Sequence, residues 1–290
     1  MHPVRVAIPN KGVMADSVLT LLADAGLDPR SHLGARALEA TLGQGFEAVF
    51  VAAANIPEFV ADGAADAGIT GWDLVCESGR RLEMRLDVEL APCRLVLAAP
   101  SDSPVGTVTD VAPGTRVATV FPRLTRAFFT EAGVVAEVVE VSGAVEITPR
   151  LGVADLVVDL VATGSTLRAN QLREVATLLV SSARVVSRPP ADDPPALRER
   201  LDELVVALGS VVQARSKRYL MANVPRERLG HVREILPGVG GPDVVELLDG
   251  GELIAVQAVV SLSSLSTTIT GLKAIGATGI VVTRIERFVP

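Results

Sequence analysis

One segment near the middle of the chain constrains the fold most: residues 155–167, with the sequence DLVVDLVATGSTL. An apolar stretch carries two acids, Asp155 and Asp159, and then breaks into a Thr-Gly-Ser-Thr turn. An apolar run of this length that ends in small polar residues predicts a buried strand. We therefore expect a strand that ends in a small-residue loop, and a short helix that begins in that loop.

The loop has two interpretations. Backbone N–H groups and hydroxyls at the positive end of a helix dipole suit a phosphate. Asp159, just upstream, can accept hydrogen bonds from hydroxyls, and a phosphate together with vicinal hydroxyls describes a ribose 5-phosphate. The same Thr-Gly-Ser-Thr sequence is also ordinary turn and N-cap chemistry. The loop alone leaves both interpretations open.

Composition narrows the class of protein. The chain has 290 residues, which suits two or three domains. Aromatic residues make up only 3%, so the cores must consist of Val, Leu, Ile and Ala. A net charge of −7 argues against a nucleic-acid or membrane-surface role, and no apolar run is long enough to span a bilayer. With two cysteines, Cys76 and Cys93, and no recognisable secretory leader, we expect a reducing cytoplasm.

Strand and helix patterns alternate along most of the chain, as in an α/β layer fold. The strands that we expect are Val4–Pro9, Glu47–Ala52, Asp66–Thr70, Arg94–Ala99, Arg116–Thr119, Val134–Glu140, Ala154–Leu160 and Leu178–Ser187. Gly143–Leu151 is expected to be a short helix, and Pro195–Ala214 a longer one with one apolar face. After it, the tail has a βαββαβ pattern, which is the ferredoxin-like arrangement.

The chain resembles a known family, the ATP phosphoribosyltransferases of histidine biosynthesis in their long form. The segment from Gly143 to Leu167 carries most of the resemblance, with matching spacing. Other stretches agree in order along the whole chain: Asn10-Lys11-Gly12, Gly68-Ile69-Thr70-Gly71, Cys93-Arg94-Leu95, Ala118-Thr119-Val120-Phe121-Pro122 and Leu272-Lys273-Ala274-Ile275-Gly276-Ala277.

The resemblance implies an enzyme that transfers the 5-phosphoribosyl group of phosphoribosyl pyrophosphate to N1 of ATP and releases pyrophosphate. It implies a two-lobed catalytic core like the periplasmic binding proteins. Residues 1–99 and 178–213 would form lobe I, residues 100–177 lobe II with the phosphoribosyl loop, and residues 214–290 a regulatory ferredoxin-like domain. Histidine would bind as feedback inhibitor, and dimers would build toward a hexamer. No nucleic-acid or membrane partner is expected.

The resemblance also suggests roles for residues of lobe II. The loop, with Leu167 beginning the helix, would hold the 5-phosphate, and its members are Thr163, Gly164, Ser165, Thr166 and Leu167. Asp159 would accept hydrogen bonds from the ribose hydroxyls. Asp155 would do the same, or would instead cap the start of the strand or face solvent. Glu146 would approach the other ribose or a magnesium ion, or would be a solvated acid at a helix start.

Two cations are candidates for the pyrophosphate. Lys11 follows the first strand, where α/β ligand sites form; otherwise it is a plain surface lysine. Arg94 is the second, unless it forms a structural ion pair with a nearby acid. Magnesium is expected to arrive on the substrate phosphates, and we name no metal ligand from the protein. Trp72, the only tryptophan, would stack on adenine or pack at the rim of the site.

One stretch departs from the family. Where the family usually carries an arginine and then an acid, this chain has Ala52 and Asn55. Loss of an arginine–phosphate contact would cost about 1–3 kcal/mol. Two further functions therefore stay open: a catalytically weakened member that acts as a binding or regulatory protein, and an anion-binding solute receptor of the same lobed fold.

Overall fold

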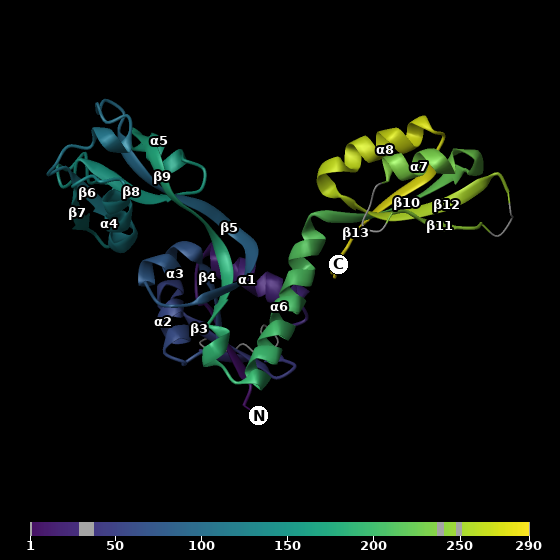
Figure 1. The fold of residues 1–290 in the computed structure, drawn as a ribbon, viewed down its shortest axis with the longest axis horizontal. Coiled ribbons are helices and arrows are strands. Elements are labelled where there is room, and N and C mark those ends of the chain that lie inside the picture. Colours follow the sequence, from purple (N-terminus) through teal and green to yellow (C-terminus); the bar gives the residue numbers. More distant parts are fainter. Residues whose placement is uncertain (1, 29–37, 237–240, 248–250, 290) are drawn as a thin grey trace. The chain divides into compact units, whose positions relative to one another are not determined.

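Two long strands hold the catalytic part of the chain together in the computed structural model, which describes residues 2–28, 38–236, 241–247 and 251–289. β5 (Glu83–Pro100) and β9 (Leu172–Ser187) run antiparallel along their whole length. Figure 1 shows the pair passing from one group of strands to the other. They form the middle of a nine-stranded sheet with the order β2-β3-β1-β4-β9-β5-β8-β6-β7.

The first group of strands, lobe I, lies on the β9 side. β1 (Val4–Pro9), β3 (Phe46–Val51) and β4 (Ala67–Gly71) are parallel, and β4 joins β9. β2 (Glu39–Gly43) adds an antiparallel edge strand. Three helices connect these strands: α1 (Val13–Asp24), α2 (Ile56–Ala61) and α3 (Trp72–Ser78).

The second group, lobe II, lies on the β5 side. β8 (Leu156–Val161) pairs antiparallel with β5, and β6 (Arg116–Thr119) and β7 (Glu137–Glu140) continue the sheet in parallel. One face packs on α4 (Pro122–Glu131) through Phe121 and Phe129. The other face is covered by Val145 and by Leu167 of α5 (Ser165–Ala169). The β8 backbone is therefore fixed from both sides.

The register of the long strands brings the ends of both groups together. Gly71, the last residue of β4, pairs with Ala183 of β9. Val161, the last residue of β8, pairs with Arg94 of β5, which in turn pairs with Val180 of β9. The carboxyl ends of the parallel strands in both lobes thus meet at the same stretch of the β5–β9 pair, and ligands of α/β sheets bind at such ends.

The chain forms two compact units, one of Met1–Ala23 with Leu27–Val205 and one of Asp24–Gly26 with Val206–Pro290. The helix α6 (Pro195–Arg215) leads from the first to the second. The second unit contains β10 (Lys217–Pro225), α7 (Leu229–Ile235), β11 (Asp243–Val245), β12 (Leu253–Ser261), α8 (Leu265–Ala274) and β13 (Thr278–Arg284). Its sheet order, β11-β12-β10-β13, is that of a ferredoxin-like domain.

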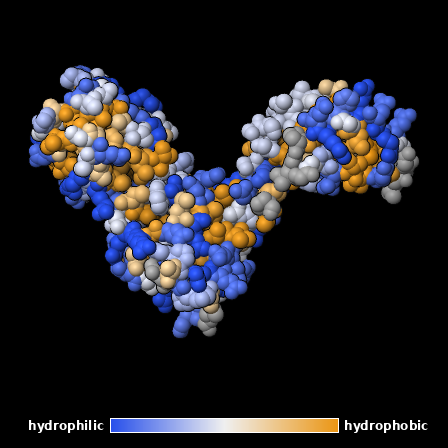
Figure 2. Space-filling view, viewed as in Figure 1, coloured by the Kyte–Doolittle hydropathy of each residue, from blue (hydrophilic) through white to orange (hydrophobic). Residues whose placement is uncertain are grey.

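Both helices of this domain contribute to one core, where Val232 of α7 and Leu272 of α8 pack with Leu220 and Val256 of the sheet. The opposite face exposes apolar residues, including Met221 and Val281, which pair in the β10–β13 register. Figure 2 shows apolar residues gathered where α7 and β12 lie.

The predicted α/β class, the two-lobed core and the βαββαβ tail are confirmed. Three details were wrong. The strands predicted at Arg94–Ala99 and Leu178–Ser187 are longer in the structure. The sequence pattern missed their extensions, because these carry charged and apolar residues on exposed faces and lack a clean buried pattern. Gly143–Leu151 contains only a 3-10 turn at Val145–Ile147, since Ala144 is left-handed (φ 51°) and Pro149 cannot donate a helical hydrogen bond. β2 was not predicted. The proposed domain boundaries stay predictions.

None of the helices within the described ranges combines the length and the apolar composition needed to cross a bilayer.

A tight contact in lobe I provides a test of the packing. A Cβ on the buried Gly68 of β4 would collide with Ile56 Cγ2 and lie 3.0 Å from Val60 Cγ2, both on α2. Gly68→Ala should therefore destabilise the protein by about 1–3 kcal/mol, measured by urea unfolding. Gly106→Ala is the control, because the nearest atom to its Cβ would be Asp110 Oδ2 at 3.5 Å. Equal stability of the two variants would contradict this packing.

Candidate active site

The loop after β8 is built around a glycine that no other residue replaces without strain. Gly164 is buried and left-handed, with φ 74°. It is the N-cap of α5, and no side chain caps this helix. The Thr163 and Ser165 hydroxyls lie 3.0 Å apart on the exposed side of the loop. Both hydroxyls therefore stay available to a ligand, which favours the phosphate interpretation over plain N-capping.

Backbone donors complete the loop. The N–H groups of Ser165, Thr166 and Leu167 open α5, and the first-turn N–H groups of a helix have no intrahelical acceptor. The helix contains only five residues, so its dipole is small. Any anion held here would depend on direct hydrogen bonds to these donors and to the hydroxyls. Leu167 itself is buried and anchors the helix in the lobe II core.

Two acids stand next to each other upstream of the loop. Asp159 is half-buried in β8, and its Oδ1 accepts the Leu160 N–H at 2.8 Å. Burial raises the pKa of the Asp159 carboxyl, and the negative charge of Glu146 raises it further. Glu146 comes from the 3-10 turn that covers the same face of the sheet. The structure thus brings together two predicted site residues of the segment from Gly143 to Leu167.

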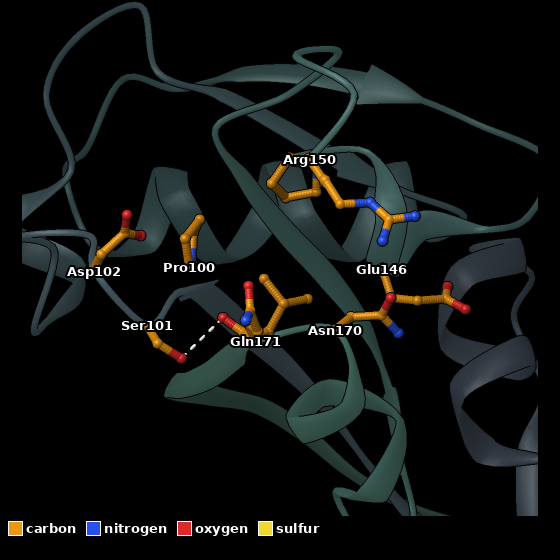
Figure 3. A pocket seen from close by; sticks show the side chains of 9 residues that line it. Pro100, Ser101, Asp102, Glu146, Arg150, Asn170 and Gln171 are labelled. Carbon is orange, nitrogen blue, oxygen red and sulfur yellow. Dashed lines mark hydrogen bonds between the residues drawn. The ribbon is translucent and has the colours of Figure 1, made fainter.

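A polar groove of about 680 Å³ borders this acid pair. Figure 3 shows Glu146, Arg150 and Asn170 along one part of it and Ser101, which donates a hydrogen bond to the Gln171 carbonyl, along another. Glu146 therefore lines the groove, whereas Asp159 does not line it and is half-buried.

Arg94 lies at the loop, but it is not a free cation. Its guanidinium binds both carboxylate oxygens of Glu174, at 2.7 and 2.9 Å. Glu174 Oε1 in turn is 3.6 Å from the position that a Cβ of Gly164 would take. Arg168 Nη1 is 3.0 Å from that same position and donates to the Thr163 carbonyl at 3.4 Å. Charged side chains thus surround the loop.

Asp155 does not belong to this group. It precedes the first residue of β8, at the opposite end of the strand from the loop. Its carboxylate accepts hydrogen bonds from the Arg116 backbone at 2.8 Å and side chain at 3.1 Å, and the pair holds the Asp155 pKa below its usual range. In this structure Asp155 lies at the strand start with Arg116, as its alternative interpretation has it. The ribose contact stays a prediction.

In lobe I, Lys11 is exposed directly after β1, beside the carboxyl end of β3, because Asn10 N–H donates to the Val51 carbonyl at 2.9 Å. Ala52 follows at the same edge, and the Ala53 carbonyl accepts from the Thr70 hydroxyl. The departure from the family pattern at Ala52 therefore lies at the same edge of the sheet as Lys11.

Trp72 opens α3 at the end of β4, in the same lobe. The Arg184 guanidinium lies over the Trp72 ring, with its central carbon 4.5 Å from the ring centroid. One face of the indole is thereby occupied, which favours packing over adenine stacking.

Sequence reasoning missed Glu174 and Arg168. Arg168 falls inside a short helix as an ordinary basic residue, and Glu174 lies in the part of β9 that was not predicted to be a strand. Only the pairing of β5 with β9 places Glu174 near Arg94.

The raised pKa of Asp159 yields a prediction with a defined sign. The folded protein holds the Asp159 proton more tightly than the unfolded chain, where the pKa is about 3.9. The contribution of Asp159 to stability must therefore fall as pH rises from about 4 through the raised pKa. Asp159→Asn keeps the Oδ1 acceptor and removes the charge, so it should melt higher than wild type at pH 7, with the difference shrinking toward pH 4.

Asp110→Asn is the control of opposite sign. Hydrogen bonds from Thr107, first from its backbone N–H, hold the Asp110 pKa below its usual value, and this variant should melt lower than wild type at pH 7. Thermal melts of the three proteins from pH 4 to 8 make the comparison. An Asp159→Asn variant that melts lower than wild type at pH 7 would contradict the assignment.

The sequence matches one known family along most of its length. The ATP phosphoribosyltransferase (HisG) family profile matches residues 52–210, and the HisG C-terminal domain profile matches residues 214–287. ATP phosphoribosyltransferase of Gemmatimonas aurantiaca is 55% identical, with 99% of this chain and all of that protein covered. The enzyme of the same name from Methanopyrus kandleri is 43% identical over 99% of this chain and all of that protein.

A solved structure agrees as well. An ATP phosphoribosyl transferase (HisG:HisZ) complex from Thermotoga maritima contains a chain that superimposes with a TM-score of 0.63 at 27% identity, covering 72% of this chain and 98% of that one. From these matches, which run from one end of the sequence to the other, we conclude that the chain belongs to the ATP phosphoribosyltransferases, enzymes of the glycosyltransferase type, in the form that carries a C-terminal domain.

Proposed function

We propose that this protein transfers the 5-phosphoribosyl group of phosphoribosyl pyrophosphate to N1 of ATP and releases pyrophosphate, as the first step of histidine biosynthesis. The observation that carries the proposal is the loop after β8, open to a ligand, with the Asp159–Glu146 acid pair beside it. The membership of the chain in the family supplies the reaction.

The reaction depends on the positioning of its two substrates more than on a nucleophile from the protein. A C–O bond at the anomeric carbon breaks while positive charge develops on the sugar, and adenine N1 takes the place of pyrophosphate. Thr163, Ser165 and the backbone of Thr166 hold the 5-phosphate. Asp159 and Glu146 accept hydrogen bonds from the ribose hydroxyls. Two carboxylates on the sugar also lie close enough to favour its developing positive charge.

Cations serve the two phosphate ends. Arg94 was a candidate for the pyrophosphate; we assign it instead to the 5-phosphate, because its partner Glu174 lies beside the loop. Lys11, at the lobe I edge, is placed for the pyrophosphate. Among the described residues no group of three or more His, Cys, Asp or Glu side chains is arranged to hold a metal ion. Mg²⁺ would therefore arrive on the substrate phosphates, where it neutralises the charge of the leaving pyrophosphate.

The second candidate function is a catalytically weakened member of the family. It is favoured by Ala52 and Asn55, which stand at the lobe I edge where the family usually carries an arginine and an acid. Without that arginine, this edge offers less positive charge to a phosphate, and Lys11 is an exposed cation there.

A steady-state assay separates these functions. Wild-type protein with millimolar ATP, phosphoribosyl pyrophosphate and Mg²⁺ should form phosphoribosyl-ATP, followed by its absorbance. Asp159→Asn should weaken phosphoribosyl pyrophosphate binding by about tenfold or more, because a carboxylate–hydroxyl hydrogen bond is lost, and a loss of 1.4 kcal/mol is tenfold. Lack of product from wild type, with binding retained, would favour the weakened member. Unchanged affinity in the variant by calorimetry would contradict the role of Asp159.

We infer further that the C-terminal domain binds histidine as feedback inhibitor and takes part in homo-oligomers, from dimers toward a hexamer. The apolar residues on its sheet face, Met221 and Val281 among them, support an assembly role. The free thiols of Cys76 and Cys93 fit a cytoplasmic protein.

Truncation tests the regulatory role. A protein that ends at Gln213 should lose histidine inhibition while it keeps phosphoribosyl transfer, because the predicted catalytic residues all precede this position. The measurements are initial rates against histidine concentration and a thermal melt that checks the truncated fold. Inhibition that persists in the truncated protein would place the histidine site elsewhere.

A further inference from the structure

The ion pair between Arg94 and Glu174 lies against the proposed phosphate loop. Arg94 Nη1 donates to Glu174 Oε2 at 2.7 Å, and Nη2 donates to Oε1 at 2.9 Å. Nη1 also lies 3.5 Å from the Thr177 hydroxyl oxygen. A fork-to-fork pair of this kind fixes the plane of the guanidinium as well as its position.

Glu174 also lies beside the loop. Its Oε1 lies 3.6 Å from the point where a Cβ of Gly164 would stand, an ordinary van der Waals distance, so the carboxylate packs next to the turn. One carboxylate therefore binds the cation and lies next to the turn. It is the link that sets where Arg94 stands relative to the loop.

We propose that Glu174 is a positioning residue of the phosphoribosyl site: it holds Arg94 beside the loop and so sets the affinity for the 5-phosphate. This inference rests on the proposed function. A guanidinium has five N–H donors, so Arg94 keeps donors for a phosphate while it binds Glu174. Without the carboxylate, the long Arg94 side chain would sample many rotamers, and ordering it would oppose substrate binding.

Because Glu174 is charged, the inference can be tested by the direction in which its neutralisation changes the affinity for the phosphate. The pair is partly exposed, with side chains 39% and 36% accessible. A carboxylate beside a phosphate repels it, so a Glu174 without a positioning role would weaken binding, and its neutralisation would tighten binding. A positioning role predicts the opposite change.

The decisive variant is Glu174→Gln. We expect its KM for phosphoribosyl pyrophosphate to rise about tenfold, the loss of one charge-assisted contact, while its KM for ATP and its kcat stay within about twofold. Glu58→Gln is the matched control, because it removes the acid of another partly exposed arginine pair, with Arg80, and should change neither KM. Glu174→Asp, which withdraws the carboxylate by one methylene, should shift the same KM in the same direction, and thermal melts verify the folds.

A double-mutant cycle tests whether Glu174 acts through Arg94. In an Arg94→Lys background, Glu174→Gln should change the KM for phosphoribosyl pyrophosphate by less than about twofold, because the fork is already lost. An unchanged or lowered KM in the single variant, or an equal effect in both backgrounds, would overturn the inference. Calorimetric titration with ribose 5-phosphate gives the same comparison without turnover. A wild-type protein that binds this sugar but makes no product would overturn the proposed function and leave Glu174 to be judged by the titration.

Discussion

The antiparallel pairing of β5 with β9 is the constraint on which the rest of the catalytic unit depends. These strands belong to both groups of parallel strands, and their register decides which residues of the two groups meet. Because Gly71 and Val161 both reach the middle of this pair, the loops that follow the parallel strands of lobe I and lobe II gather in one region. A shift of the pair by one residue would turn its side chains to the opposite faces and would separate Arg94 from Glu174.

The loop after β8 shows how backbone conformation and charge act together. Gly164 permits the left-handed turn, and its missing side chain also leaves room for the Arg168 guanidinium. In the proposed function the small residues of the loop leave hydroxyl and N–H groups open to the ligand, while charged side chains lie close to the turn. Because Asp159 is half-buried, its charged form is destabilised and its pKa is raised.

Local pattern predicted much of this fold. Valine-rich runs between amphipathic helices indicate an α/β sheet, and the loop, Asp159 and Gly164 are visible as one continuous segment. Pairing across the sheet was not predictable. Asp155 has the same spacing from apolar residues as Asp159, yet it faces Arg116 at the other strand end. Glu174 reaches the loop region only through the pairing of β9 with β5, which no local periodicity records.

The two halves of the site differ in how they are encoded. The half proposed for the sugar lies on β8 and on the loop that follows it, and the lobe II core fixes both. The half proposed for the pyrophosphate lies at the ends of β1, β3 and β4, where Lys11 is exposed and Ala52 has a short side chain. The two lobes also touch outside the β5–β9 pair, because Glu77 of α3 accepts hydrogen bonds from the Arg123 and Leu124 N–H groups at the start of α4. In the proposed function phosphoribosyl pyrophosphate spans both edges, with its 5-phosphate at the loop and its pyrophosphate at Lys11, so substitutions at either edge should change the affinity for this substrate.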